Sequence, residues 1–131
     1  MHKKTLVLDF DGVIHGYQSG WQGIGTIPDP PVGGAMIALQ KYTEDPEIQV
    51  AILSSRSRDP VGLNAMQTWL EIELHRALDS EIAKRTFAAI QWPTEKPAAW
   101  VLLDDRAWCF RGEFPAASKI KEFQPWYKEQ P

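Results

Sequence analysis

Three short runs of almost wholly apolar residues constrain the fold of this 131-residue chain most strongly. They cover residues 5–8, 48–53 and 100–103, and each leads directly into charged or hydroxyl side chains. Runs of this length with no polar face are typical of strands that are buried on both sides in a parallel sheet. A weaker apolar run, residues 87–91, predicts one more strand before the last.

Helical patterns separate these strands. Apolar residues recur at helical spacing over residues 32–42 and again over about 63–77. Residues 94–99 are expected to hold a helical turn, residues 108–111 a further strand and residues 116–123 a short helix. We therefore predict an α/β fold, a three-layer sandwich around a mostly parallel, Rossmann-like sheet.

One domain accounts for residues 1–131, because neither a linker nor an internal repeat interrupts the pattern. The Gly and Pro residues between positions 13 and 31 predict a long flap loop in place of a regular element. The end of the chain, residues 124–131, is predicted to be irregular and partly held in place by Trp126 and Tyr127.

The composition indicates the class of protein, its partners and its cellular compartment. Hydrophobic residues make up 44% and charged residues 24% of the chain, which is typical of a folded soluble domain. A formal net charge of -3 gives no general attraction to nucleic acid. Cys109 is the single cysteine, so no intramolecular disulfide forms, and the first apolar run ends at Asp9, too early for a signal peptide. Since no stretch reaches the roughly 18 apolar residues of a membrane span, we expect a cytoplasmic protein without a membrane partner.

Polar side chains gather where the predicted strands end. The carboxyl ends of parallel strands meet at one edge of a sheet, and ligands bind there in open α/β folds. This edge is expected to receive Asp9, Asp11, Ser54, Arg56, Asp104 and Asp105. Several carboxylates in one place need raised pKa values or a cation, and Mg²⁺ prefers carboxylate and water oxygens. A cation beside hydroxyls and positive side chains indicates phosphoryl transfer, in which a carboxylate can itself attack phosphorus.

Taken alone, residues 9–12 also match a solvated turn or the start of a calcium loop. An EF-hand, however, needs a Glu at its twelfth position, and Gly20 stands there. Ser54 and Lys96 carry little weight individually, because serines end many strands and a lysine before a proline is commonly a surface residue. The order of these residues along the chain supplies the argument.

Four segments in order resemble the motifs of the haloacid dehalogenase superfamily of phosphohydrolases. Residues 8–13 (LDFDGV) are similar to the first motif, and residues 52–54 (ILS) to the second, a hydrophobic strand that ends in Ser or Thr. Lys96 resembles the third motif, a lysine, and residues 101–105 (VLLDD) the fourth, an acidic pair after a strand. The resemblance covers residues 5–106 and implies the hydrolase fold of this superfamily.

The resemblance implies a Mg²⁺-dependent phosphatase that works through an aspartyl-phosphate. By position, Asp9 would attack phosphorus, and Asp11 would act as general acid and base. The Asp9 carboxylate, the backbone carbonyl of Asp11 and one residue of the acidic pair would hold Mg²⁺. Asp105 is favoured as the direct ligand and Asp104 as close support.

The resemblance also implies which residues bind the phosphoryl group. It gives this role to Ser54 and Lys96, and we also expect Ser55 and Arg56, which follow the second strand, to contact the phosphoryl group. The crossover between residues 91 and 100 is short for a parallel connection, which leaves the reach of Lys96 open. Lys84 is the alternative lysine.

The chain departs from the family in having no room for a cap domain after the first or the second motif. We therefore expect an open site that suits a bulky phosphorylated substrate, such as a nucleotide, a polynucleotide end, a phosphoprotein or a glycan, unless oligomerisation supplies the missing wall. Monomer and homodimer both stay open. The flap loop offers His15, Tyr17 and Trp21 for contact with the leaving group, and Arg56 and Arg58 are candidates for substrate binding.

Two other functions stay open. A receiver-like phosphoacceptor shares the α/β fold, an acidic metal site, a hydroxyl and a lysine. Receivers, however, carry their phosphorylated Asp after the third strand, where this chain has residues 91–93 (QWP). A catalytically silent phosphate-binding module would keep the motif residues without turnover.

Overall fold

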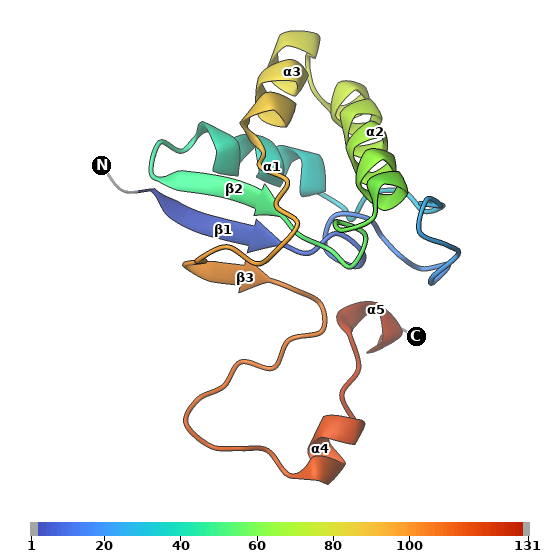
Figure 1. Ribbon diagram of the computed structural model, residues 1–131, viewed down its shortest axis with the longest axis vertical. Coiled ribbons are helices and arrows are strands. Elements are labelled where there is room, and N and C mark those ends of the chain that lie inside the picture. The colour runs from blue at the N-terminus through green and yellow to red at the C-terminus, as the bar shows by residue number, and fades with distance from the viewer. Residues whose placement is uncertain (1–2, 130–131) are drawn as a thin grey trace.

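A three-stranded parallel sheet forms the centre of the molecule. The structure, a computed structural model, describes residues 3–129. Strands β1 (Lys4–Leu8), β2 (Ile48–Ile52) and β3 (Val101–Leu103) lie in the order β2-β1-β3 (Figure 1). Because β1 pairs in parallel with both neighbours, the carboxyl ends of all three strands lie at the same edge. The predicted α/β class with a parallel sheet is confirmed.

The described residues form five helices: α1 (Ala35–Glu44), α2 (Pro60–Ala77), α3 (Ser80–Ala89), α4 (Ala117–Lys121) and α5 (Trp126–Glu129). The start of α2 follows from its sequence. The Asp59 carboxylate accepts hydrogen bonds from the backbone N–H groups of Val61 and Gly62, and Pro60 occupies the first turn, where no N–H is needed. The predicted first, second and C-terminal helices are thus confirmed, with shifted ends. Within residues 3–129, no helix has both the length and the apolarity to cross a membrane.

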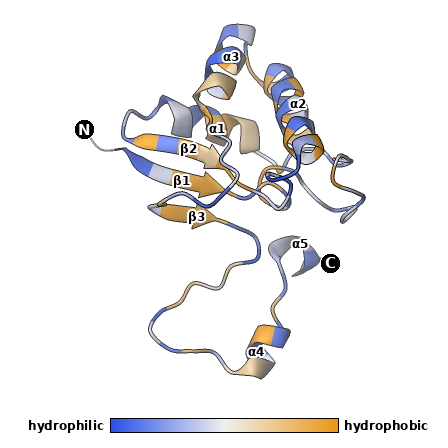
Figure 2. Cartoon of the chain, in the orientation of Figure 1, coloured by the Kyte–Doolittle hydropathy of each residue, from blue (hydrophilic) through white to orange (hydrophobic). Residues whose placement is uncertain are grey.

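The core lies between the sheet and the first three helices. Leu6 and Leu8 of β1 lie opposite Val50 and Ile52 of β2, and side-chain alternation puts all four on one face. They form one buried cluster with residues of the helices, among them Met36, Leu39, Met66, Leu70, Leu74 and Ala83. Figure 2 shows the hydrophobic residues along the carboxyl-terminal halves of β1 and β2 and along β3. This packing fixes the strand ends that carry the candidate site.

The predicted strand over residues 87–91 is wrong. Helix α3 covers most of this run, and only Gln91 forms a single bridge, to Ala51 at the outer side of β2. A short apolar run is compatible with a strand or with a buried helix. Here the helix forms because its buried face, which includes Ala83 and Thr86, packs into the core.

Two further predictions of short elements are also wrong, since residues 94–99 hold no helical turn and residues 108–111 no strand. The described connection between α3 and β3 therefore supplies no helix to the sheet, and the three-layer sandwich is not confirmed. Strand β3 is correspondingly open, with Val101 48% exposed.

The C-terminal arm, residues 106–125, leaves the end of β3 and runs away from the sheet (Figure 1). Helix α4 stands at the far end of the arm, and α5 lies back near the carboxyl ends of the strands. The arm exposes its aromatic side chains, and Phe114 is 89% exposed. The predicted hold by Trp126 and Tyr127 is confirmed, because both side chains contact the body of the molecule. The predicted irregular end instead contains the helical turn α5, and residues 130–131 lie outside the described residues.

The buried face of α2 generates a stability prediction. Leu70 is completely buried, so Leu70→Ala should lower the free energy of unfolding by about 2–5 kcal/mol. Ile72 on the same helix is 48% exposed, and Ile72→Ala should change it by no more than about 0.5 kcal/mol. Urea unfolding of both variants measures this, and equal losses would contradict the assigned core.

Candidate active site

The carboxyl ends of the strands bring the predicted acidic residues together. Asp9 follows β1 directly, and Asp104 and Asp105 follow β3. The backbone N–H of Asp9 donates to the carbonyl of Leu103 at 2.9 Å, which extends the ladder between β1 and β3 up to the site. On the other side, the N–H of Leu53 donates to the carbonyl of Leu8 at 3.1 Å. The acidic residues are therefore placed by rigid sheet backbone.

Asp9, Asp104 and Asp105 form an acidic cluster. Each offers one carboxylate oxygen, and these oxygens lie within 4.8 Å of one another. The Asp105 side chain is only 1% exposed, and neither of its oxygens accepts a hydrogen bond from the described residues. The nearest positive group is the Nε of Arg106, at 4.0 Å from Oδ2. A buried carboxylate without a hydrogen-bond partner is costly unless something else satisfies it.

Asp9, like Asp105, lies where a negative charge is poorly stabilised. Burial first, and then the neighbouring Asp105 carboxyl, raise the pKa of Asp9 to about 8. The backbone N–H of Phe10, which donates to Asp9 Oδ1 at 2.8 Å, opposes this rise only in part. A divalent cation among the three carboxylates would offset both the burial and the repulsion, and an all-oxygen donor set suits Mg²⁺. The residues present therefore fit the cation that the motifs imply.

A cleft of about 510 Å³ opens beside the acidic cluster. It is lined by Asp9, Leu53, Ser54, Ser55, Arg58, Thr94, Glu95, Lys96 and Asp104. Residues from all four motif segments thus meet at one cleft. Lys84, the alternative lysine, lies on α3 outside this lining, where its ammonium is 3.8 Å from Glu81.

A tight turn orients Ser54 in the cleft. The backbone N–H of Ser54 donates to the hydroxyl of Ser57 at 2.9 Å, and the Ser54 hydroxyl accepts the N–H of Arg56 at 3.2 Å. Because the Ser54 oxygen already accepts, its own O–H is left to donate to a ligand. Ser57 is 2% exposed and supports this turn, a role that a serine in a polar stretch does not signal in the sequence.

Asp11 lies in a different environment from Asp9. Its carboxylate accepts hydrogen bonds from Nδ1 of His15 at 2.9 Å and from Nε of Arg56 at 3.0 Å. Burial alone would raise the pKa of Asp11, but these hydrogen bonds and the charge of Arg56 hold it below its usual value. His15 stands four residues after Asp11, and this spacing is the only sequence signal for the contact.

Arg56 lies beneath the flap loop, away from the cleft where it was predicted to bind phosphate. It is fully buried, and besides Asp11 it donates to the carbonyls of Gly23 at 3.0 Å and Ile24 at 2.7 Å. Its guanidinium lies 4.6 Å from the ring centre of Trp21. The cation that reaches the cleft from this segment is Arg58, whose Nε donates to the carbonyl of Thr94 at 3.2 Å.

The predicted flap loop is tied to the body of the molecule. His15 is fully buried, and its Nε2 accepts the N–H of Asp29 at 3.0 Å, so its ring proton sits on Nδ1 towards Asp11. The N–H of Gly16 donates to the carbonyl of Pro30 at 2.8 Å and closes the base of the loop. His15, one of the residues predicted to contact the leaving group, is therefore buried and does not line the cleft.

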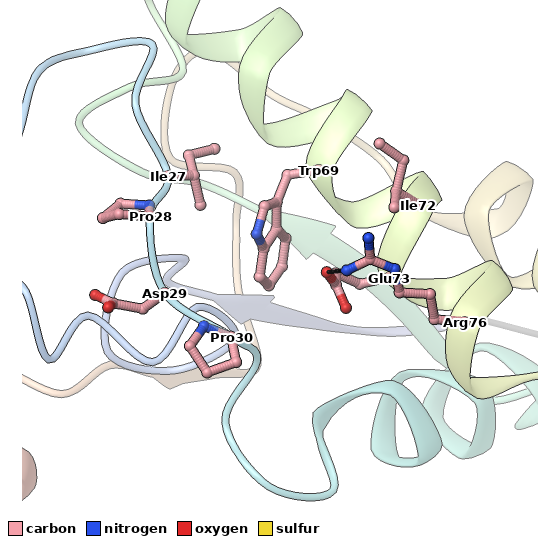
Figure 3. A pocket seen from close by; sticks show the side chains of 8 residues that line it. All are labelled: Ile27, Pro28, Asp29, Pro30, Trp69, Ile72, Glu73 and Arg76. Atoms are coloured by element: carbon pink, nitrogen blue, oxygen red, sulfur yellow. Dashed lines mark hydrogen bonds and ion pairs between the residues drawn. The ribbon is translucent and has the colours of Figure 1, made fainter.

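A second cavity, of about 420 Å³, lies between the flap loop and α2 (Figure 3). It is lined by Ile27, Pro28, Asp29, Pro30, Trp69, Ile72, Glu73 and Arg76. Arg76 and Glu73 form an ion pair at 2.8 Å on its helical wall. None of the acidic cluster lines this cavity, so it is separate from the cleft.

Tyr17 and Tyr127 pack against each other near Asp105. Their rings meet edge to face with centres 5.9 Å apart, which joins the flap loop to α5. Tyr17 has a φ of 64°, a left-handed conformation that a bulky residue rarely adopts. Burial first, and then the Asp105 carboxylate, raise the pKa of Tyr127 to about 12, so its hydroxyl keeps its proton at neutral pH.

Comparison with known proteins yields no relative, since the chain matches no protein-family model, no curated protein and no solved structure. The function is therefore inferred from the order of the motifs and from the geometry of the site.

The buried contact between Asp11 and Arg56 generates a pH-dependent prediction. Asp11→Asn leaves the Arg56 charge without its carboxylate, which should lower the free energy of unfolding by about 3–5 kcal/mol at pH 7. Because the pKa of Asp11 is lowered in the folded protein, its stabilisation is present above about pH 4 and is lost as the pH falls further. In urea unfolding, the difference in free energy of unfolding between wild type and variant should therefore decrease towards pH 3.

The control is Glu47→Gln, at an exposed carboxylate, which should unfold like the wild type at each pH. The ion pair would be contradicted if wild type and Asp11→Asn had the same free energy of unfolding at pH 7. It would also be contradicted if the difference between them were as large at pH 3 as at pH 7.

Proposed function

We propose that this chain is a Mg²⁺-dependent phosphatase, a phosphoric monoester hydrolase that acts through an aspartyl-phosphate at Asp9. The observation that carries the proposal is the buried, unpartnered carboxylate of Asp105 beside Asp9, next to a cleft that Ser54 and Lys96 also line. The resemblance to the haloacid dehalogenase motifs supports it, because the four segments come together in space as well as in order.

In this proposal, the carboxylates of Asp9 and Asp105 and the backbone carbonyl of Asp11 would hold Mg²⁺, with Asp104 in close support. When bound, the ion neutralises charge on the phosphoryl oxygens and on the carboxylates. Asp105 is the better direct ligand, because it is buried and lacks another partner, whereas Asp104 accepts the N–H of Arg106 at 2.8 Å.

The reaction proceeds in two half-reactions. An Asp9 oxygen forms a bond to phosphorus while the bond to the leaving oxygen breaks, which gives an acyl phosphate and the leaving group as its oxyanion. Water then gives a proton to the Asp11 carboxylate and attacks this phosphorus. The bond between phosphorus and the Asp9 oxygen breaks, so that inorganic phosphate leaves and the Asp9 carboxylate is restored. The Ser54 hydroxyl and the Lys96 ammonium hold the phosphoryl oxygens, whose charge they stabilise in both steps.

Asp11 takes the part of general acid and base. Its contacts with His15 and Arg56 keep the carboxylate ionised, which is the state needed to take a proton from the attacking water. To protonate a leaving oxygen, Asp11 would first have to leave these contacts and take up a proton from solvent, because its ionised carboxylate has none to donate. A substrate whose leaving group departs as a stable anion, such as an aryl phosphate, is therefore the best first probe.

The finer structural assignment belongs to the same proposal. We assign the chain to the capless type of this superfamily, with the three-layer sandwich as the finer form of its α/β fold. An open cleft with Arg58 and Lys96 on its wall suits a bulky phosphorylated substrate, including a nucleotide or a polynucleotide end. A cytoplasmic location agrees with the single cysteine.

Replacement of the nucleophile tests the proposal. Wild type should hydrolyse an aryl phosphate with Mg²⁺ and lose this activity with a chelator, and Asp9→Asn should show only the background rate, because an amide cannot form the acyl phosphate. Asp45→Asn, at an exposed carboxylate beyond the opposite edge of the sheet, is the matched control and should keep wild-type turnover. Undiminished turnover by Asp9→Asn would refute the mechanism.

The two candidate lysines give a second test. Lys96→Ala removes a cation from the cleft and should lower kcat/KM for the aryl phosphate by about a hundredfold. Lys84→Ala removes an exposed cation from α3 and should leave kcat/KM unchanged. Steady-state kinetics on both variants decides between them, and the reverse result would transfer the role to Lys84.

A further inference from the structure

Helix α5 returns from the C-terminal arm to the acidic cluster, where a cap domain is absent. We propose that α5 is a built-in cover of the cation site and that Tyr127 is a positioning residue that holds Asp105 for the cation. This inference rests on the cation site of the proposed function, and it adds a role for a segment outside the four motifs.

The first contact of α5 is a hydrogen bond to the loop of the first motif. The indole N–H of Trp126 donates to the backbone carbonyl of Gly12 at 2.7 Å, and the partners are 114 residues apart in the chain. Gly12 follows Asp11 and has a φ of 85°, the left-handed region that favours glycine. The end of the chain is thereby attached directly beside the proposed nucleophile and acid-base residue.

Tyr127, Gly12 and Asp105 meet at one point. A Cβ atom placed on Gly12 would lie 2.8 Å from Cε1 of Tyr127 and would clash with Oδ2 of Asp105. The absent side chain of Gly12 is therefore what lets the Tyr127 ring and the Asp105 carboxylate approach together. This close approach leaves the Asp105 side chain 1% exposed.

Further contacts orient the Tyr127 ring. Its hydroxyl accepts a hydrogen bond from the guanidinium of Arg106 at 3.2 Å, and Arg106 is the residue directly after Asp105. The ring also packs edge to face on Tyr17 and on Trp126, with centres 5.9 Å and 5.7 Å apart. Tyr127 is thus fixed to the strand end that carries the acidic pair and to the flap loop at once.

The arm contributes to this placement at its two ends, through Arg106 and the buried Pro125. Between them it runs out to α4 and back (Figure 1), and Phe114 in this stretch is 89% exposed. Trp126 and Tyr127 join α5 to Gly12 and to the flap loop. On the other side of the cluster Asp104 is exposed at the cleft, which leaves a route for a cation and a substrate. A cover on the Asp105 side keeps water from screening that carboxylate and so strengthens its attraction for a cation.

Mg²⁺ titration of the full chain by calorimetry tests the cover. Tyr127→Ala should weaken Mg²⁺ binding by about tenfold or more, which is the usual effect of losing a group that supports a metal ligand. Trp126→Phe, which keeps an aromatic ring and loses the donor to Gly12, should weaken it less. Tyr127→Phe keeps the ring beside Asp105 but loses the contact of its hydroxyl with Arg106, and should weaken Mg²⁺ binding less than Tyr127→Ala does. Phe114→Ala, on the exposed part of the same arm, is the matched control and should bind like the wild type.

Turnover separates positioning from a general effect on structure. In Tyr127→Ala, the Mg²⁺ concentration for half-maximal hydrolysis of an aryl phosphate should rise, while the rate at saturating Mg²⁺ should largely recover. If Tyr127→Ala does not fold, as judged by circular dichroism, Trp126→Phe carries the test.

The outcomes distinguish this inference from the proposed function. Equal Mg²⁺ affinity in wild type and in the folded α5 variants would overturn the cover and leave the phosphatase untouched. Failure of the wild type to bind Mg²⁺ would overturn the cover together with the cation site. Weaker Mg²⁺ binding in the α5 variants, without turnover of aryl phosphates by the wild type, would support the cover and count against the phosphatase.

Discussion

Repulsion among three carboxylates at one edge of a small sheet is the constraint on which this structure depends. Asp9, Asp104 and Asp105 are brought within 4.8 Å because the strands that precede them are parallel neighbours. Protein donors do not balance this charge, since the buried oxygens of Asp105 have no hydrogen-bond partner among the described residues. We propose that a cation offsets this charge and acts on a phosphoryl group bound in the cleft beside it.

The two carboxylates of the first motif have opposite environments two residues apart. Burial and acidic neighbours raise the pKa of Asp9, whereas His15 and Arg56 keep that of Asp11 low in spite of burial. When the pKa values of neighbouring carboxyl groups differ in this way, the groups can take different chemical roles. The buried guanidinium of Arg56 also fastens the flap loop through backbone carbonyls, so the charge on Asp11 and the position of the loop depend on the same side chain.

Sequence patterns predicted the parts of the molecule that local chemistry decides. The three confirmed strands are solid apolar runs, and the residues after them point to the site. The run over residues 87–91 was assigned wrongly because a short apolar run fits a strand or a buried helix equally, and packing of α3 decides it. The destination of Arg56 and the return of α5 to Gly12 depend on contacts between distant segments, which no local pattern encodes.

The position of the covalent intermediate shows whether Asp9 is the nucleophile. Wild-type protein is mixed with Mg²⁺ and an aryl phosphate, reduced at once with borohydride, which converts an acyl phosphate to an alcohol, and then mapped by peptide mass spectrometry. If Asp9 forms the aspartyl-phosphate, homoserine is found at position 9 and at no other aspartate. Homoserine at another aspartate, or none while hydrolysis proceeds, would contradict it.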